Sequence, residues 1–266
     1  MKINGKTVNI IAHRTKVTNQ ICPIHHEHLV YLEGFKKMKP FCELCEAEKK
    51  QAQIKKMAQN LRTRQTRGYL KRQSLVDRDE VFNYTFKNFK AQPKTFEYSA
   101  KKGAHDIAKG YLRYPNAKGN CIFYGNAGSG KTHLAMAILN AVNDNADPMV
   151  RCLFISVNKL IREMKNWFQD KTGIWSPKHV TDVVSKANLV VLDDLGAESA
   201  NNMATSFVQD TIFDIYESNQ RIITTTNLSL DELYRTYHSR LVSRMQESDR
   251  RKVIDFSKIA DKRPRI

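Results

Sequence analysis

The stretch Gly125-Asn126-Ala127-Gly128-Ser129-Gly130-Lys131-Thr132 decides the fold. It fits the pattern G-x-x-x-x-G-K-[ST], the Walker A phosphate-binding loop. Its glycines let the backbone curl until its N–H groups point at phosphate oxygens. In such a loop Lys131 reaches the β- and γ-phosphates and the Thr132 hydroxyl binds Mg²⁺. The sequence therefore predicts a site for ATP and Mg²⁺.

The residues on either side have the composition that a phosphate loop requires. Residues 120–124 (NCIFY) form a short apolar run that predicts a buried strand. Residues 132–143 are rich in Ala, Leu and Met and favour a helix. Phosphate would then lie at the positive N-terminal end of that helix. We include His133, which directly follows the motif, among the nucleotide-binding candidates.

Strands and helices alternate along most of the remaining chain. We expect further strands at 152–156, 189–192 and 221–225, and helices at 96–111, 157–169, 176–186 and 200–219. Such alternation predicts an α/β fold with a parallel sheet and right-handed crossovers.

Two of these strands end in polar residues that suit phosphoryl transfer. The run 189–192 (LVVL) leads into Asp193 and Asp194, a Walker B pattern. Asp193 would help to hold Mg²⁺, and Asp194 would orient or deprotonate the attacking water. Asn227 follows the last of the four strands and could hydrogen-bond the γ-phosphate and the water, although an Asn at a strand end is usually a turn residue.

A pair of arginines follows on an expected helix. Arg240 and Arg244 are four residues apart and share one face of that helix. An arginine supplied by a neighbouring subunit stabilises the charge of γ-phosphate transfer. Surface arginines of a basic protein are the alternative interpretation.

Three of the five cysteines cluster near the N-terminus. Cys22 and His25 form one C-x2-H pair, and Cys42 and Cys45 form a C-x2-C pair. Three thiolates and one imidazole favour tetrahedral Zn²⁺ in a closed, structural site. His26 and His28 are alternative imidazoles. Cys121 and Cys152 lie in apolar runs and are expected to be inert core residues.

Composition narrows the class of protein. The net charge is +17, which favours a polyanionic partner such as nucleic acid, although a solvated basic surface would give the same value. The chain has no apolar run of membrane-spanning length and no signal peptide. We therefore expect no membrane contact and a place in the bacterial cytosol.

The chain is expected to have three parts. Residues 1–75 would form a zinc-binding domain with a long basic helix at 45–71, and residues 76–104 a linker and docking segment. An ATPase domain would cover 105–266. The aromatic residues of the docking segment are expected to pack on the ATPase core: Phe82, Tyr84, Phe86 and Phe89.

Together, these motifs resemble the DnaC/DnaI-type replicative helicase loaders of the AAA+ superfamily. The residues that carry the resemblance are Tyr84-Thr85-Phe86-Lys87-Asn88-Phe89, Gly125–Leu134, Leu192–Glu198, Thr224–Leu228 and Ser239–Met245. The N-terminal cysteines resemble the zinc module of the DnaI branch, and phage loaders can have similar modules.

The resemblance implies a role for each matched residue. Asn227 corresponds to sensor 1 and Arg244 to the arginine finger, with Arg240 beside it. Asp194 stands where many AAA+ proteins have glutamate, which suits slow hydrolysis. Lys262 or Arg263 is nearest to the family's sensor 2 arginine. The resemblance also implies partners: a hexameric DnaB-type helicase gripped by the N-terminal domain, single-stranded DNA at the ATPase core, and neighbouring copies of the chain.

Other functions share parts of this pattern. An IstB-type transposition helper has the same ATPase core, but the zinc knuckle argues against it. A DnaA-type initiator would need a helix-turn-helix, and only about ten residues follow a further expected strand close to the C-terminus. A nucleotide kinase should have an arginine-rich lid and no paired Asp193–Asp194. A zinc adaptor with a dead ATPase fold is disfavoured by the intact Lys131, Asp193 and Asn227.

Overall fold

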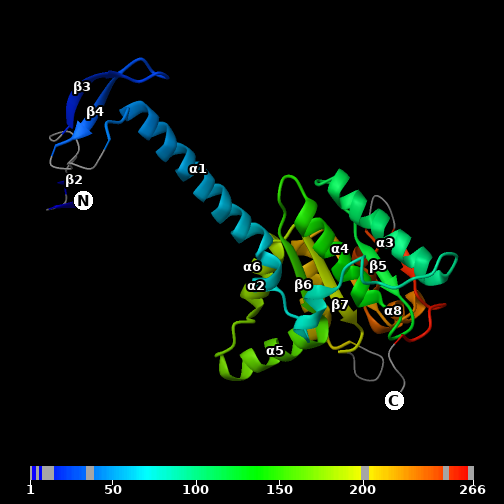
Figure 1. Cartoon of the computed structure of the whole chain (residues 1–266). Helices are drawn as coiled ribbons and strands as arrows, with labels where there is room; N and C mark the ends of the chain where they lie inside the picture. Colours follow the sequence, from blue (N-terminus) through cyan, green and yellow to red (C-terminus); the bar gives the residue numbers. More distant parts are fainter. Residues whose placement is uncertain are drawn as a thin grey trace. The chain divides into compact units, whose positions relative to one another are not determined.

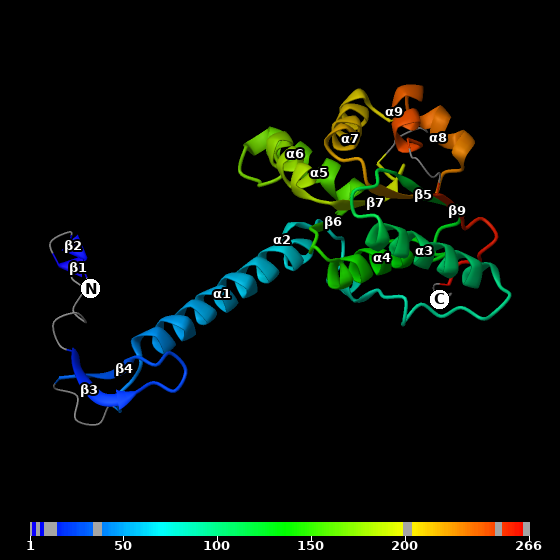
Figure 2. The ribbon, with the colours of Figure 1, turned by 90° about the horizontal axis from the view of Figure 1, so that it is seen from above.

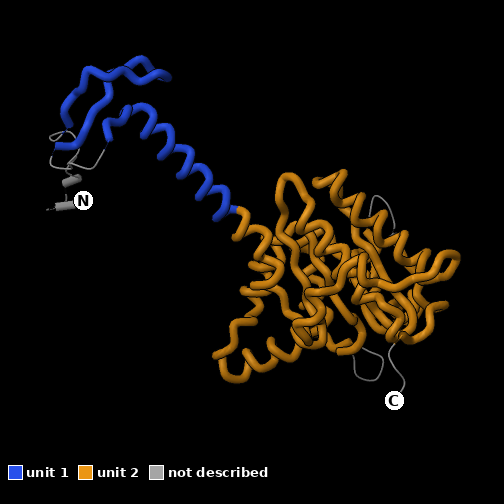
Figure 3. The backbone as a smooth tube through the Cα atoms, in the orientation of Figure 1, with its two compact units in different colours: residues 1–62 blue, residues 63–266 orange. Residues whose placement is uncertain are grey.

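A computed structural model of the chain describes residues 2–3, 6–7, 15–33, 39–198, 204–247 and 252–262 (Figure 1). The described residues fall into two compact units (Figure 3). Unit 1 is Met1–Arg62 and unit 2 is Thr63–Ile266. The division lies inside the long basic helix, and the predicted functional boundaries at residues 75 and 104 remain predictions.

Unit 1 contains four short strands among its described residues. β1 (Lys2–Ile3) pairs antiparallel with β2 (Lys6–Thr7), and β3 (Thr15–Ile21) pairs antiparallel with β4 (His28–Leu32). Val30 also bridges Phe41, which brings the chain back to the hairpin just before the long helix. Cys22 and Cys42 are buried.

The predicted helix at 45–71 is two helices. α1 spans Glu43–Arg67 and α2 spans Tyr69–Gln73. The break lies at Gly68, where a helical glycine weakens the segment. The Arg72 guanidinium donates to the carbonyls of Arg64 and Gln65 across this break. Every residue of α1 is at least partly exposed, whereas Tyr69 and Leu70 of α2 are buried.

Unit 2 contains a five-stranded parallel sheet with the strand order β6-β7-β8-β5-β9. All its neighbouring strands are parallel, which confirms the predicted α/β fold. The phosphate loop follows β5, and the carboxyl ends of the adjacent strands β7, β8 and β5 lie together at that edge of the sheet. The strands are β5 (Cys121–Tyr124), β6 (Cys152–Ser156), β7 (Leu189–Leu195), β8 (Ile222–Thr226) and β9 (Lys252–Asp255).

Helices cover both faces of this sheet (Figure 2). α3 and α4 pack on one face, and α5 to α9 on the other. Alternate residues of β6 enter the two apolar clusters: Leu153 and Ile155 face one, Cys152 and Phe154 the other. The helices are α3 (Phe96–Arg113), α4 (Lys131–Asn145), α5 (Val157–Asp170), α6 (Pro177–Lys186), α7 (Ser206–Ser218), α8 (Leu230–Thr236) and α9 (Ser239–Met245).

The helix expected at 200–219 begins only at Ser206, because Thr205 acts as its N-cap and accepts from the Val208 amide; residues 200–203 lie outside the described residues. Cys121 and Cys152 are buried core residues as predicted, and burial raises the pKa of the Cys152 thiol to about 12. Within the described residues, no helix is long and apolar enough to cross a membrane.

Candidate functional site

The phosphate loop connects β5 to α4 through three glycines with positive φ. These angles are 124° at Gly125, 69° at Gly128 and 96° at Gly130, which ends the loop as the N-cap of α4. Packing also requires glycine here. A Cβ on Gly130 would lie 2.6 Å from Cε2 of Phe89, and one on Gly128 would overlap the Asp261 carboxylate. The loop is therefore closely covered by two distant parts of the chain.

Lys131 lies buried inside the curl of the loop. Its ammonium donates to the carbonyls of Gly125 and Asn126 and to Oδ1 of Asn227, each at 2.7 Å. The lysine is therefore positioned by the loop itself and by the end of β8, so its charge faces the space where phosphate would bind.

Asp193 is the buried carboxylate of the site. Its Oδ2 accepts from the Thr132 hydroxyl at 3.1 Å, and its Oδ1 accepts from the Thr225 hydroxyl at 2.7 Å. Burial raises the pKa of Asp193 to about 6, an effect that the two hydroxyl hydrogen bonds oppose. Thr132 and Asp193, the two predicted Mg²⁺ ligands, are thus in direct contact. Thr225, which was not among the predicted site residues, supports them through its hydrogen bond to Asp193.

Asp194 has a backbone conformation that few non-glycine residues adopt. Its φ is 58°, at an irregularity in the pairing of β7 with β8 between Leu192 and Leu195. The Asp194 amide donates to the Thr225 hydroxyl, and its Oδ1 accepts from Nδ2 of Asn227 at 2.8 Å. Consecutive side chains of a regular strand point to opposite faces of the sheet, and at this irregularity both Asp193 and Asp194 line one cavity.

That cavity has a volume of about 550 Å³. It brings together the predicted Ala127, Gly128, Gly130, Lys131, Thr132, His133, Asp193, Asp194 and Asn227. Several further lining residues were not predicted as site residues, and most of them come from the segment before α3. They are Asp77, Arg78, Val81, Tyr84, Asn88, Phe89, Lys90 and Thr225. Lys262, one of the two sensor 2 candidates, also lines the cavity.

The segment before α3 is held on α4 through His133. The Tyr84 ring stacks on the His133 ring with centroids 4.5 Å apart, and His133 Nε2 lies 2.9 Å from Oδ1 of Asn88. Phe89 is buried, and the other three aromatic residues pack against the same cluster, which confirms the predicted docking. His133 therefore forms part of the cavity wall, and the Y-T-F-K-N-F pattern was the sequence signal for this contact.

The C-terminal residues pack against the phosphate loop. Asn126, a predicted nucleotide-binding residue, directs its side-chain amide to the carbonyls of Ser257 and Ile259. Ser129 donates to the Asn126 carbonyl at 2.6 Å, within the loop. The Lys262 amide donates to the Gly128 carbonyl, so Lys262 lines the cavity. The other sensor 2 candidate, Arg263, lies outside the described residues.

Arg240 and Arg244 lie on α9, outside the cavity of their own subunit. Arg244 pairs with Glu217 at 2.8 Å and with Glu247 at 2.7 Å. The Arg240 guanidinium lies over the Phe213 ring, 4.4 Å from its centroid. Both side chains are therefore held on the surface of unit 2, and their role as arginine fingers stays a prediction.

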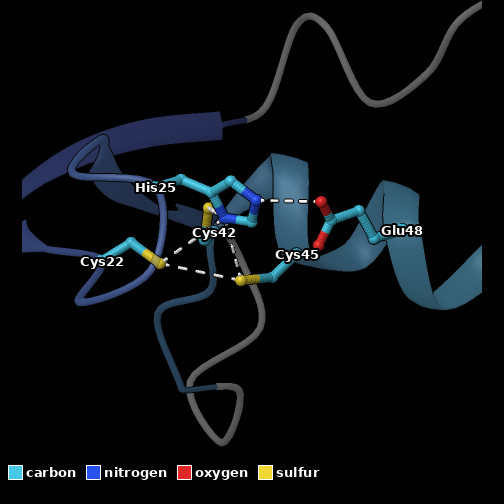
Figure 4. Close-up of polar contacts among 5 residues, drawn as sticks. All are labelled: Cys22, His25, Cys42, Cys45 and Glu48. Atoms are coloured by element: carbon cyan, nitrogen blue, oxygen red, sulfur yellow. Dashed lines mark hydrogen bonds and ion pairs between the residues drawn. The ribbon is translucent and has the colours of Figure 1, made fainter.

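Unit 1 holds the predicted metal ligands together (Figure 4). The ligand atoms of Cys22, His25, Cys42 and Cys45 all lie within 4.8 Å of one another. His25 directs Nδ1 at the sulfurs, 3.3 Å from Sγ of Cys45 and 3.6 Å from Sγ of Cys42. The sulfurs of Cys22 and Cys45 are 3.6 Å apart. This geometry and ligand set fit a tetrahedral zinc ion.

The surroundings of the cluster also suit a metal. His25 Nε2 lies 3.1 Å from a Glu48 oxygen, the carboxylate contact that orients zinc-binding histidines. The backbone amides of His25 and Ile24 lower the pKa of the Cys22 thiol to about 6. Burial raises the pKa of Cys45 to about 11, so binding zinc would release its proton. His28 instead contacts the Thr18 carbonyl, and His26 is outside the cluster.

Comparison with known proteins identifies the family. The profile of the IstB-like ATP binding proteins matches residues 47–245, from α1 to the end of α9. The chain belongs to the IstB-like family. The matched region contains the phosphate loop, both aspartates, Asn227 and both arginines of α9. All four metal-ligand candidates, Cys22, His25, Cys42 and Cys45, precede the match and lie outside it.

The names of two curated relatives of this IstB-like chain refer to DNA replication. The chromosomal replication initiator protein DnaA of Kosmotoga olearia is 26% identical over 164 residues, which are 62% of this chain and 34% of that protein. The replicative helicase loader DnaC of Escherichia coli K12 is 23% identical over 165 residues, which are 62% of this chain and 63% of that protein. The chain thus spans about a third of the first of these relatives.

Among solved structures, the crystal structure of DnaI is similar to this IstB-like chain. The TM-score is 0.52 at 22% identity, over 69% of this chain and 93% of that one. This likeness concerns the fold. The family match and the shared fold confirm the predicted resemblance to AAA+ proteins of the DnaC and DnaI kind. Membership of an ATP-binding family also implies nucleotide and Mg²⁺ as ligands, which the cavity fits.

Proposed function

We propose that this protein is an ATP-dependent loader of a hexameric DnaB-type replicative helicase onto single-stranded DNA. The observation that carries the proposal is the presence of a separate compact unit with a Cys₃His cluster ahead of a complete AAA+ nucleotide cavity. A nucleotide cavity alone suits many functions. A second unit with a Cys₃His cluster offers a surface for a partner protein, and the similarity to the replicative helicase loader DnaC supports a helicase as that partner.

The chain's own residues have distinct roles in this proposal. Lys131 and the loop amides bind the phosphates, while Thr132 and Asp193 hold Mg²⁺, which supplies charge neutralisation at the phosphates when it is bound. Asp194 and Asn227, already hydrogen-bonded to each other, orient the attacking water. Arg244 serves the nucleotide of the adjacent subunit. The short side chain of Asp194 suits slow hydrolysis, so ATP acts as a signal for assembly and release.

A transposition-helper function is the second candidate. The IstB-like profile match over residues 47–245 favours it, because it covers nearly all of the ATPase core. In that case the partner would be a transposase on DNA, and unit 1 would bind it in place of a helicase.

Co-elution with a replicative helicase tests the proposal. The full-length protein is mixed with the DnaB-type helicase of the same host, with and without ATP, and analysed by size-exclusion chromatography with light scattering. We expect a complex whose stoichiometry changes with ATP. The matched variants are Lys131→Ala, which should bind the helicase without responding to ATP, and Cys42→Ser, which should lose the complex. Absence of co-elution in both conditions would refute the loader function and leave the transposition-helper function as the next to test.

A further inference from the structure

The residues after α2 extend the edge of the parallel sheet. Leu75 forms a parallel bridge with Ile155 of β6: its amide donates to the Phe154 carbonyl, and its carbonyl accepts from the Ser156 amide, both at 2.8 Å. The Ser74 hydroxyl accepts from the Phe154 amide at 2.8 Å. This pairing fixes the direction and register of the segment. The residues that follow Leu75 therefore emerge at the carboxyl end of the sheet, where the nucleotide cavity lies.

Asp77 is fixed beside the aspartates of β7. The Ser156 hydroxyl donates to Oδ2 of Asp77 at 2.7 Å, and Ser156 is the residue of β6 paired in register with Asp193. The Lys159 ammonium, on the first turn of α5, also donates to the Val76 carbonyl at 2.8 Å. These two hydrogen bonds, together with the pairing of Leu75, hold this part of the chain at the end of the cavity where Asp193 and Asp194 lie.

Arg78 follows Asp77 and lines the same cavity as Lys131, Asp193 and Asp194. It is exposed, and among the described residues its guanidinium has neither a hydrogen-bond acceptor nor an ion-pair partner. By contrast, Lys262, another cation of the cavity wall, donates to the Lys90 carbonyl and lies over the Phe89 ring. A guanidinium offers a planar fork of donors that matches phosphate oxygens. Arg78 is thus available for an anion at the aspartate end.

We propose that Arg78 binds the terminal phosphate of ATP within its own subunit and that this contact distinguishes ATP from ADP. The inference rests on the proposed function only in that the cavity takes ATP. The position of Arg78 is set by Ser74, Leu75 and Asp77, so the arginine reaches the cavity from the sheet edge. Arg244 approaches, if at all, from another subunit, so the two arginines would act independently.

With Arg78 on the terminal phosphate, residues 74–78 would link the nucleotide cavity to the helices that lead to unit 1. Arg78 is separated from α1 only by Gly68, α2 and the short paired segment. A phosphate bound by Arg78 would hold residues 74–78 against β6 more firmly than ADP does. The chain that leads to unit 1 would therefore carry information on which nucleotide is bound.

The test compares two nucleotides and three variants of the full chain. Affinities are measured by calorimetry with Mg²⁺ and either ADP or an ATP analogue with a non-hydrolysable β–γ bond. Arg78→Gln is expected to weaken binding of the analogue about 10- to 100-fold and binding of ADP less than about 3-fold, since hydrogen bonds to charged groups have this strength. Arg78→Lys should recover part of the difference. Arg72→Gln is the matched control, because Arg72 bonds only helix carbonyls outside the cavity among its recorded partners.

A second readout separates the phosphate contact from a structural effect. Hydrogen exchange of peptides covering residues 74–83 should slow more with the ATP analogue than with ADP in the native protein, and equally in Arg78→Gln. Equal weakening of both nucleotides by Arg78→Gln, or no weakening of either, would overturn the inference. Lys131→Ala should lose both nucleotides; if it retains both, the cavity is not the nucleotide site and the proposed function fails first.

Discussion

Lys131 Nζ and Asn227 Oδ1 are 2.7 Å apart, and this hydrogen bond joins the phosphate loop to the end of β8. Asn227 Nδ2 in turn donates to Asp194 Oδ1 at 2.8 Å. A chain of three polar side chains therefore crosses the cavity from the phosphate-binding lysine to the residue proposed to orient water. A change in any one of the three is therefore expected to alter the positions of the other two.

Replacing Lys131 with alanine should abolish ATP binding without disturbing unit 1. The ammonium is buried and hydrogen-bonded within the loop, and its removal takes away the positive charge that meets the phosphates. We expect ATP affinity to fall by about 100-fold or more, as for the loss of several charged hydrogen bonds. Equilibrium dialysis measures the loss, and the zinc content should stay unchanged. Loss of zinc in the same variant would contradict the independence of the two units.

Replacing Asn227 with alanine should slow hydrolysis more than it weakens binding. The variant frees Asp194 and Lys131 from their shared partner, while the loop amides and Thr132 remain. We expect kcat to fall about 10- to 100-fold with a change in KM below about 3-fold. Asn145→Ala is the matched control, because Asn145 is exposed and bonds only the Ala141 carbonyl of its own helix among its recorded contacts. A rise in KM with an unchanged kcat would assign Asn227 to substrate binding instead.

Replacing Thr225 with valine should destabilise unit 2. The Thr225 hydroxyl donates to the buried Asp193 and accepts from the partly buried Asp194 amide, so valine leaves both polar groups without this partner. The free energy of unfolding should fall by about 1–3 kcal/mol. Chemical denaturation measures it, with Thr181→Val as the control, because Thr181 is exposed and bonds a carbonyl of its own helix. Equal stability of the two variants would argue against the role of Thr225.

The native protein should contain one zinc ion per chain, and Cys42→Ser should lose it. Glu48→Gln should retain the ion but bind it about 10- to 100-fold more weakly, because the carboxylate contact to His25 Nε2 orients the ligating ring. Competition with a chromophoric chelator measures both effects. Glu46→Gln is the control, since Glu46 pairs only with the exposed Lys49 among its recorded ion pairs. A metal-free native preparation would refute the site.

Arg244→Ala and Lys131→Ala should complement each other. The first variant keeps its own cavity but offers no arginine, and the second offers the arginine without binding ATP, because Arg244 lies outside the cavity of its own subunit. Each variant alone should be inactive under conditions in which the native protein hydrolyses ATP. Mixing them should restore part of the ATPase rate. A mixture as inactive as its components would show that Arg244 does not act between subunits.

The sequence was sufficient to predict four strands of the sheet, β5 to β8, and the cluster of ligands in unit 1, whereas no bounds were predicted for β9. Apolar runs such as 189–192 are flanked by polar residues, which marks them as buried strands. The C-x2-H and C-x2-C spacings mark Cys22, His25, Cys42 and Cys45 as ligands of one metal ion. Asp193, Asp194 and Asn227 were predictable because parallel strands end at one edge. In each case the signal is local, or follows from a rule of sheet topology.

The rest of the site depends on contacts between distant residues. The stacking of Tyr84 on His133 and the packing of Phe89 against Gly130 place the segment before α3 in the cavity wall. The aromatic pattern of this segment predicted that it packs on the ATPase core, but not that it packs beside the phosphate loop and α4. No sequence pattern marks Arg78 as a site residue, because its position in the cavity follows from the pairing of Leu75 with Ile155. The late start of α7 was missed because a cap at Thr205 competed with a continuous helical composition.

The close cover of the phosphate loop has a consequence for how this family can vary. Gly130 leaves room for Phe89, and Gly128 leaves room for the Asp261 side chain. A relative with alanine at either glycine needs a smaller or displaced residue at the partner position. Residues 89 and 130, and residues 128 and 261, should therefore change together across related chains, although 41 residues separate the first pair in sequence and 133 the second.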